Sequence, residues 1–306
     1  MYSSLHNHSH FSLLDGYATP KEYMERAKEI GLKAFAITEH SNEYSWCYFE
    51  KLKKDYPEIK IIYGVELYEA FDMYEQDKNS KYFHLIAFAR NENGRKALNK
   101  IVTASNFEGF YYKPRIDINL LKPYAKDLVI SSACLASKIA RESNYSKCIE
   151  YINEYKSIFP YFYLEMQSHS HEEQEIYNKK ILQLSKDTKT PYIITTDSHA
   201  ATKEDLYYQS RHVQIAHDSD TLSEVYEGCY LQSEEDIHNI MDKQIGKEAV
   251  DIGLLRTNEI AELIEEVKMP FQSPQLPTFP LPKEFNNNYE YLKHLVELGW
   301  NERGFN

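Results

Sequence analysis

The chain has 306 residues, of which 42% are hydrophobic and 27% charged, so it is long enough to bury a core and is neither collagen-like nor disordered. Its 35 basic and 47 acidic side chains give a net charge of −12, which argues against a surface that holds a nucleic-acid backbone by charge alone. Four scattered cysteines, no secretory leader and no apolar run of about 18 residues predict a reduced, cytoplasmic protein without membrane contact.

Short β-rich runs alternate with stretches of helical spacing along most of the chain. Seven runs predict strands, at residues 3–6, 34–38, 59–66, 82–89, 128–132, 161–166 and 192–196. Helices are predicted at residues 20–30, 44–55, 94–104, 146–158, 172–187, 203–215, 234–241, 245–267 and 288–300. The first helix has clear end signals, because Thr19 can cap it, Pro20 opens it and Gly31 follows its last residue.

The repeated order of strand and helix predicts parallel strands with crossover helices, closed or nearly closed into a TIM-like β/α barrel. An open doubly wound sheet is the alternative, but it would need a glycine-rich phosphate turn near the first strand, and the sequence has none. We therefore predict an α/β barrel with a helical tail over residues 1–268. Residues 269–306 are predicted to form a proline-rich linker followed by one helix. We expect this helix to be the start of a connection to a neighbouring domain that is not in this sequence.

Metal-capable side chains lie where the predicted strands end. His6 and His8 flank Asn7 in the first run, so the alternation of an extended strand points both imidazoles to the same side. Five further runs carry His, Asp, Glu or Cys at or just after the same end, and in a β/α barrel these ends meet at one mouth. Each residue alone is weak evidence, but the set predicts a multinuclear metal site. Its nine members are His6, His8, Asp15, His40, Glu66, Cys134, His169, Asp197 and His199.

The other histidines lack this placement. His84 lies in the middle of the fourth run, so it is predicted to be a core residue or to support a ligand from behind. His171 and His212 have no partner at ligand spacing, although both could approach the mouth.

Seven motifs resemble those of the PHP (polymerase and histidinol phosphatase) superfamily. They are LHNHS at 5–9, SLLDG at 12–16, TEH at 38–40, GVE at 64–66, EGFYYKPR at 108–115, SSACLA at 131–136 and TTDSHA at 195–200. The histidine pairs are similar to those of the whole superfamily, whereas EGFYYKPR and SSACLA resemble the polymerase branch, the N-terminal PHP domain of bacterial DNA polymerase III alpha subunits. Glu39 and Ser132 stand where Asp and Gly are usual in that family, but neither is a ligand position.

This resemblance implies a distorted seven-stranded β/α barrel that binds two to three divalent metal ions through the same nine residues. Our hypothesis for the grouping places one ion on His6, His8, Glu66 and Asp197, a second on Glu66, Cys134 and His169, and a third on Asp15, His40 and His199. The mixture of imidazole, carboxylate and thiolate donors suits Zn²⁺, Mn²⁺ or Fe²⁺.

The implied activity is hydrolysis of a phosphodiester by a metal-bound hydroxide, in a 3′–5′ exonuclease that proofreads beside a polymerase. The predicted catalytic residues are Asp197, His199 and Glu66, together with Arg115. Arg115 and its neighbour Lys113 are candidate phosphate clamps, the alternative being that both are solvated loop charges.

Three aromatic residues precede this pair. Phe110, Tyr111 and Tyr112 could stack an unpaired base, but we expect them rather in the core.

The expected partners are a DNA 3′ end or another phosphate ester, and a polymerase core or other replication proteins. The chain contains no palm, fingers or thumb, so no polymerase activity is expected from it. Two alternatives remain open. One is a small-molecule phosphatase of the histidinol-phosphate type, and the other is a non-catalytic module that supports a polymerase, for which the apolar residues of the last helix would need a partner surface.

Overall fold

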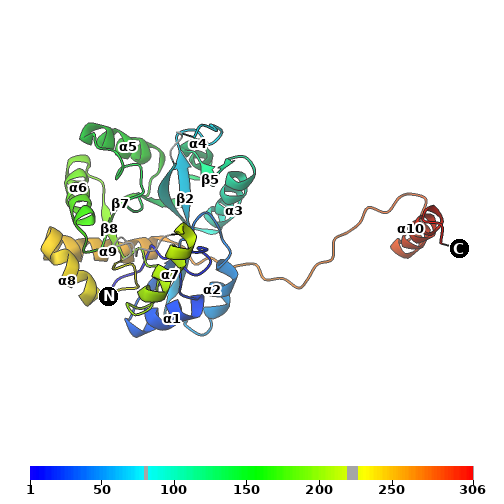
Figure 1. Cartoon of the computed structure of the whole chain (residues 1–306), viewed down its shortest axis with the longest axis horizontal. Coiled ribbons are helices and arrows are strands. Elements are labelled where there is room, and N and C mark those ends of the chain that lie inside the picture. Colours follow the sequence, from blue (N-terminus) through cyan, green and yellow to red (C-terminus); the bar gives the residue numbers. More distant parts are fainter. Residues whose placement is uncertain (79–81, 219–226, 306) are drawn as a thin grey trace. The chain divides into compact units, whose positions relative to one another are not determined.

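The computed structural model describes residues 1–78, 82–218 and 227–305 (Figure 1). The chain divides into two compact units, Met1–Lys268 and Met269–Asn306. Within the described residues, no helix is both long and apolar enough to cross a membrane.

The larger unit is built on one curled, mixed sheet. Its strands are β1 (Ala34–Ile37), β2 (Lys60–Ala70), β3 (Tyr82–Ala89), β4 (Phe110–Tyr111), β5 (Lys113–Ile116), β6 (Leu128–Ser131), β7 (Phe162–Gln167) and β8 (Tyr192–Thr195). They are ordered β4-β5-β2-β3-β6-β7-β8, and β1 pairs with β2. Six of these strands coincide with predicted ones, whereas the short hairpin of β4 and β5 was not expected.

The N-terminal segment closes the curl of the sheet. Ser4 forms a parallel bridge to Phe35 of β1, and Asn7 forms a parallel bridge to Ser198, just beyond β8. On the β8 side, the amide of His8 donates to the carbonyl of Ser198 at 2.7 Å. The first predicted strand therefore lies between β1 and β8, and the distorted seven-stranded barrel is confirmed.

One strand runs against the prediction of a parallel barrel. β3 is antiparallel to both neighbours, with Ile86 opposite Glu66 of β2 and opposite Ser131 of β6. Only residues 71–81 connect β2 to β3, which is too short for the crossover helix that a parallel pair needs. As a result, β3 begins at the end of the barrel where the parallel strands finish.

Helices surround this sheet. They are α1 (Pro20–Glu29), α2 (Trp46–Leu52), α3 (Glu92–Phe107), α4 (Ile118–Leu121), α5 (Tyr145–Ile158), α6 (Glu172–Thr188), α7 (Leu206–His217), α8 (Glu234–Ile245) and α9 (Lys247–Leu263), with a 3₁₀ turn at Lys122–Tyr124. The predicted cap of α1 is confirmed, because the Thr19 side chain accepts from the Glu22 amide and Glu22 bonds back to Thr19.

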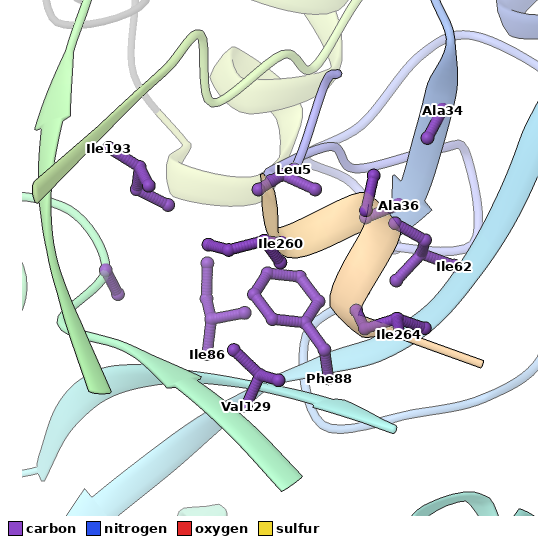
Figure 2. Packing of buried hydrophobic residues seen from close by; sticks show 12 residues of the cluster. Leu5, Ala34, Ala36, Ile62, Ile86, Phe88, Val129, Ile193, Ile260 and Ile264 are labelled. Atoms are coloured by element: carbon purple, nitrogen blue, oxygen red, sulfur yellow. The ribbon is translucent and has the colours of Figure 1, made fainter. Parts of the chain in front are cut away.

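The apolar core fills one end of the barrel. Figure 2 shows Ile260 of α9 and Ile264, just beyond it, beside Ile86 and Phe88 of β3 and Ile62 of β2. Ile62 lies near the beginning of β2 and Phe88 near the end of β3, so the cluster fills the end of the barrel at which the parallel strands start. The opposite end, where the parallel strands finish and β3 begins, is therefore left to polar side chains.

The smaller unit contains residues 269–282, which form neither helix nor strand, and the helix α10 (Asn288–Glu302). Asn287 caps this helix by accepting from the amide of Glu290. None of its residues is buried, and Leu292, Val296 and Trp300 are more than half exposed.

Candidate metal centre

Four ligand-type side chains converge at the polar end of the barrel. The Nε2 atoms of His6 and His8 are 3.1 Å apart. Asp197 Oδ1 is 3.1 Å from the first and 3.5 Å from the second, and the Glu66 oxygens are 3.4 and 3.5 Å from them. Atoms bound tetrahedrally to one ion at about 2.0–2.1 Å are about 3.4 Å from one another. The four groups therefore have the spacing of ligands around a single metal ion.

Hydrogen bonds behind the two histidines fix which nitrogen faces this group. His6 Nδ1 is 2.6 Å from Glu165 Oε1, so Nδ1 carries the proton and donates it to the carboxylate. His8 Nδ1 is 3.0 Å from Ser12 Oγ, whose hydroxyl donates to Glu39, so Nδ1 is again the donor. The Nε2 atoms are therefore the ones that face the centre. Although burial opposes it, Asp197 and Glu165 raise the pKa of His6 well above its usual value, so in the metal-free protein a proton can lie between the two Nε2 atoms. A metal ion would take the place of that proton, so the residues fit a bound cation.

A second group lies on the other side of Glu66. His84 Nδ1 is 2.9 Å from Glu66 Oε1, and Cys134 Sγ is 3.8 Å from the same oxygen and 3.5 Å from His84 Nδ1. A nitrogen and a sulfur ligand of one zinc ion would be about 3.5 Å apart, given bonds of about 2.0 and 2.3 Å. Burial, with Glu66 next to it, raises the pKa of the Cys134 thiol well above its usual value, so a cation would be needed to hold the thiolate.

His84 occupies the place in this group that sequence reasoning gave to His169. It is the third residue of β3, and because β3 is antiparallel, its beginning lies at the polar end. His169 also lines the cavity, but its Nε2 lies 2.8 Å from the Thr196 carbonyl oxygen and 3.6 Å from Cys229 Sγ. The choice of His169 assumed seven parallel strands, and that assumption hid the histidine at the start of the reversed one.

A third group contains Asp15, His40 and His199. Asp15 Oδ2 is 2.8 Å from His40 Nε2 and 3.2 Å from His199 Nε2. The other nitrogen of His199 lies 2.8 Å from the carbonyl oxygen of Asp197, to which it donates. Asp197 itself has φ of 46°, in the left-handed region that aspartate enters more readily than most residues other than glycine.

Several buried atoms of these groups have no hydrogen-bond partner among the residues that the structure describes. They are His40 Nδ1, Glu66 Oε2 and Asp197 Oδ1. His40 Nδ1 lies 2.7 Å from Glu66 Oε2, although the geometry is not that of a hydrogen bond. Buried polar atoms are almost always paired, so three orphans in one place are further evidence that these residues fit a bound cation.

The electrostatics of the centre also require positive charge. Although burial opposes it, the carboxylates of Glu66 and Asp15 raise the pKa of His40 to about 9. Burial would raise the pKa of Glu66, yet His84 and His40 hold it well below its usual value. Burial and the neighbouring His40 and His199 lower the pKa of His8 to about 3. Without metal ions, protonated imidazoles have to neutralise the buried carboxylates.

These groups open into a cavity of about 410 Å³. Arg141 and His171 line it, and Arg141 is the one arginine or lysine among the described residues that do so. His212 is not among the lining residues and packs against Tyr17 instead, with ring centroids 5.4 Å apart.

Arg115 is not brought to the cavity. Its side chain is buried, and its guanidinium donates to the backbone carbonyls of Gly109, Met73 and Glu75. This contradicts its prediction as a phosphate clamp, because a cation that satisfies backbone carbonyls inside the protein cannot reach a substrate. Lys113 is exposed and lies over the ring of Tyr68, at 5.3 Å, near the rim of the centre.

Glu165 and Gln167 are buried polar residues that sequence reasoning did not single out. Besides binding His6, Glu165 accepts from the hydroxyls of Ser131 and Thr195, and Gln167 donates to Asp197 at 3.1 Å. The two residues are two positions apart in one strand, so both side chains point to the same face of the sheet. This spacing could have identified them in the sequence as residues that point into the barrel.

A family model confirms the class of this protein. The model for the PHP domain matches residues 4–169, more than half of the chain. The chain therefore belongs to the PHP domain family, as its motifs predicted.

Its relatives include DNA polymerase III alpha subunits. This chain is 34% identical to that of Borreliella burgdorferi over 96% of its own length, 31% identical to that of Treponema pallidum over 98%, and 32% identical to that of Aquifex aeolicus over 98%. The predicted similarity to this branch is confirmed. The chain spans only about a quarter of these relatives, 26%, 26% and 27% of their lengths.

Solved structures similar to this one include a putative metal-dependent phosphoesterase from Bifidobacterium adolescentis, with a TM-score of 0.44, 13% identity and coverage of 79% of this chain and 96% of that one. Another is Endonuclease Q in complex with a 27-mer duplex that carries an abasic lesion, with a TM-score of 0.39, 15% identity and coverage of 64% and 48%.

Proposed function

We propose that this chain is a metal-dependent phosphoesterase, and more specifically the 3′–5′ exonuclease module of a replicative polymerase of the DNA polymerase III alpha type. The observation that carries the proposal is the convergence of three ligand groups around Glu66, with the Nε2 atoms of His6 and His8 directed at one point. Such a cluster is typical of multinuclear sites that hydrolyse phosphate esters.

The ligand assignment that we propose has three parts. The first ion is held by His6, His8, Glu66 and Asp197, the second by Glu66, His84 and Cys134, and the third by Asp15, His40 and His199. Donors of mixed softness favour Zn²⁺, Mn²⁺ or Fe²⁺. When bound, these ions would neutralise the phosphate and lower the pKa of an attacking water molecule.

The protein's own groups position the reaction. Glu165 and the pair of Ser12 and Glu39 hold the rings of His6 and His8 in one tautomer, which keeps both Nε2 atoms directed at the centre. His199 is oriented in the same way by the carbonyl of Asp197. Arg141 is the residue at the cavity that can attract a phosphate, in place of Arg115.

The polymerase context rests on the relatives. Each of these three relatives is a polymerase subunit about four times as long as this chain, so a polymerase body and replication proteins are the partners that we propose. The exposed apolar side of α10 agrees with a joint to such a body. The same exposed side of α10 is also expected if the module only supports the polymerase and has no activity of its own.

A nuclease assay separates these possibilities. Purified protein with Mn²⁺ should release label from the 3′ end of single-stranded DNA, whereas the Asp197→Asn variant should release almost none. Asp251→Asn, an exposed aspartate of α9, is the matched control and should be fully active. Intact DNA with the wild type would refute the exonuclease. Hydrolysis of p-nitrophenyl phosphate without action on DNA would favour a small-molecule phosphatase, and a metal-dependent melting temperature without any hydrolysis would favour the scaffold.

A further inference from the structure

The hairpin of β4 and β5 exposes aromatic rings that are expected in the core from the sequence. Phe110 is 54% exposed and Tyr112 is 72% exposed. Only Tyr111 is partly covered, by the Arg115 guanidinium at 5.2 Å and by the edge of Tyr112 at 4.7 Å. Both rings leave more than half of their surface exposed, and neighbouring exposed aromatic rings form a candidate contact surface rather than part of the core.

The tip is also strained. Tyr111 pairs with Lys113, which leaves Tyr112 alone at the turn, with φ of 60°. Glycine is the residue that adopts this conformation without cost, whereas a bulky side chain is rarely found there. The sequence therefore keeps a tyrosine where folding favours glycine, and strained residues of this kind cluster at ligand-binding sites.

The base of the hairpin is held rigidly. Arg115 ties it to the backbone at Gly109, Met73 and Glu75. A side chain at Gly109 would place its Cβ only 2.0 Å from the Arg115 carbonyl oxygen, so the close approach requires glycine. The motif EGFYYKPR thus builds a fixed support that presents Phe110 and Tyr112 to the outside, and a preorganised surface loses little entropy on binding.

This support continues into the metal centre. The Lys113 ammonium lies 5.3 Å from the ring of Tyr68. The Tyr68 ring in turn lies 5.9 Å from that of His40 and 5.3 Å from that of His84. One buried tyrosine therefore separates an exposed cation from two proposed metal ligands.

We propose that this hairpin is the docking platform for an unpaired end of single-stranded DNA, and the inference rests on the proposed function. Phe110 and Tyr112 stack on bases, and Lys113, which lies over the ring of Tyr68 beside the metal centre, binds a backbone phosphate. Aromatic rings beside a cation are the combination that binds single strands without regard to sequence, because every base has a stacking face. A single lysine agrees with the acidic surface, since stacking provides most of the affinity.

The test uses the full chain and a short single-stranded DNA with 2-aminopurine at its 3′ end and a phosphorothioate last linkage, so that binding is measured without cleavage. Binding should quench the fluorescence of the 2-aminopurine. Tyr112→Gly should weaken binding about tenfold, while its melting temperature stays equal or rises because the strain is relieved. Phe110→Ala should weaken binding similarly. Tyr289→Ala, at an equally exposed tyrosine of the smaller unit, is the control and should bind like the wild type.

The outcomes separate this inference from the proposed function. Unchanged affinity in both hairpin variants would overturn the platform, and would leave the rings to a protein partner. A loss of affinity together with a lower melting temperature in Tyr112→Gly would also overturn it, because the hairpin would then be only structural. Binding that depends on Tyr112, in a protein that does not hydrolyse unmodified DNA, would refute the exonuclease and leave the platform standing.

Discussion

Replacing Glu66 with glutamine tests whether the three ligand groups form one centre. Glutamine keeps the shape of the side chain and removes its charge. The carboxylate is buried and has imidazole nitrogens of His40 at 2.7 Å, His84 at 2.9 Å and His6 at 3.4 Å. We expect the variant to lose the two ions that Glu66 helps to hold and to keep the one on Asp15, His40 and His199.

The same substitution has a calculable effect on the metal-free protein. Removing one partner of a buried ion pair costs about 3–5 kcal/mol. For a unit of this size, 1 kcal/mol shifts the melting temperature by roughly 2–4 °C. The melting temperature after chelation should therefore fall by on the order of 10 °C.

Glu69→Gln is the matched control. Glu69 lies three residues further along the same strand and is equally buried, but its partners are Lys138 at 3.4 Å and the hydroxyl of Tyr155. This variant should also be destabilised, yet it should bind as much metal as the wild type. Elemental analysis of the dialysed proteins gives the ion count. A Glu66→Gln protein with the full count, or an equal loss in both variants, would refute the shared centre.

Three further predictions concern ligands, chelation and pH. His84→Gln should lose one ion while His169→Gln keeps the full count by elemental analysis, and the reverse would restore the sequence-based choice. Chelation of the wild type should lower its melting temperature in calorimetry, because an ion present at a hundred times its dissociation constant stabilises the fold by about 2.7 kcal/mol; an unchanged value would argue against bound metal. Burial, partly offset by Arg95, raises the pKa of Glu43 from 4.5 to about 8. The folded protein then binds the extra proton, so the free energy of unfolding should fall as pH rises from 4.5 to 8, and Glu43→Gln should flatten this slope in urea titrations of the chelated protein.

Much of the fold follows from patterns that span a few residues. Alternation and helix-end signals located six strands and every helix except the short α4, because capping residues such as Thr19 and Pro20 act locally. The direction of β3 could not be predicted in this way. It depends on how residues 71–81 connect β2 to β3, and the alternation of hydrophobic residues along a strand does not indicate in which direction the strand runs. The reversal then decided the one ligand for which sequence and structure disagree, His84 against His169.

Side-chain surroundings were the other limit. Arg115 reads as an available cation in the sequence, whereas its carbonyl partners come from residues about 40 positions earlier and from Gly109. Conversely, Phe110 and Tyr112 read as core residues because they are aromatic. The burial of an aromatic ring in a two-residue strand depends on which distant residues pack against it. A local sequence pattern contains no information about those residues.

The N-terminal segment both completes the barrel and supplies His6 and His8, and this affects when the centre can form during synthesis. Asn7 bonds to Ser198, which is 191 residues later in the chain. The proposed ligands His6 and His8 are thus translated well before their neighbours Asp197 and His199, which follow only near the end of the barrel. A nascent chain that stops before Asp197 would carry an open sheet with seven of the nine proposed ligands, so the first and third ion sites can be completed only when the barrel closes.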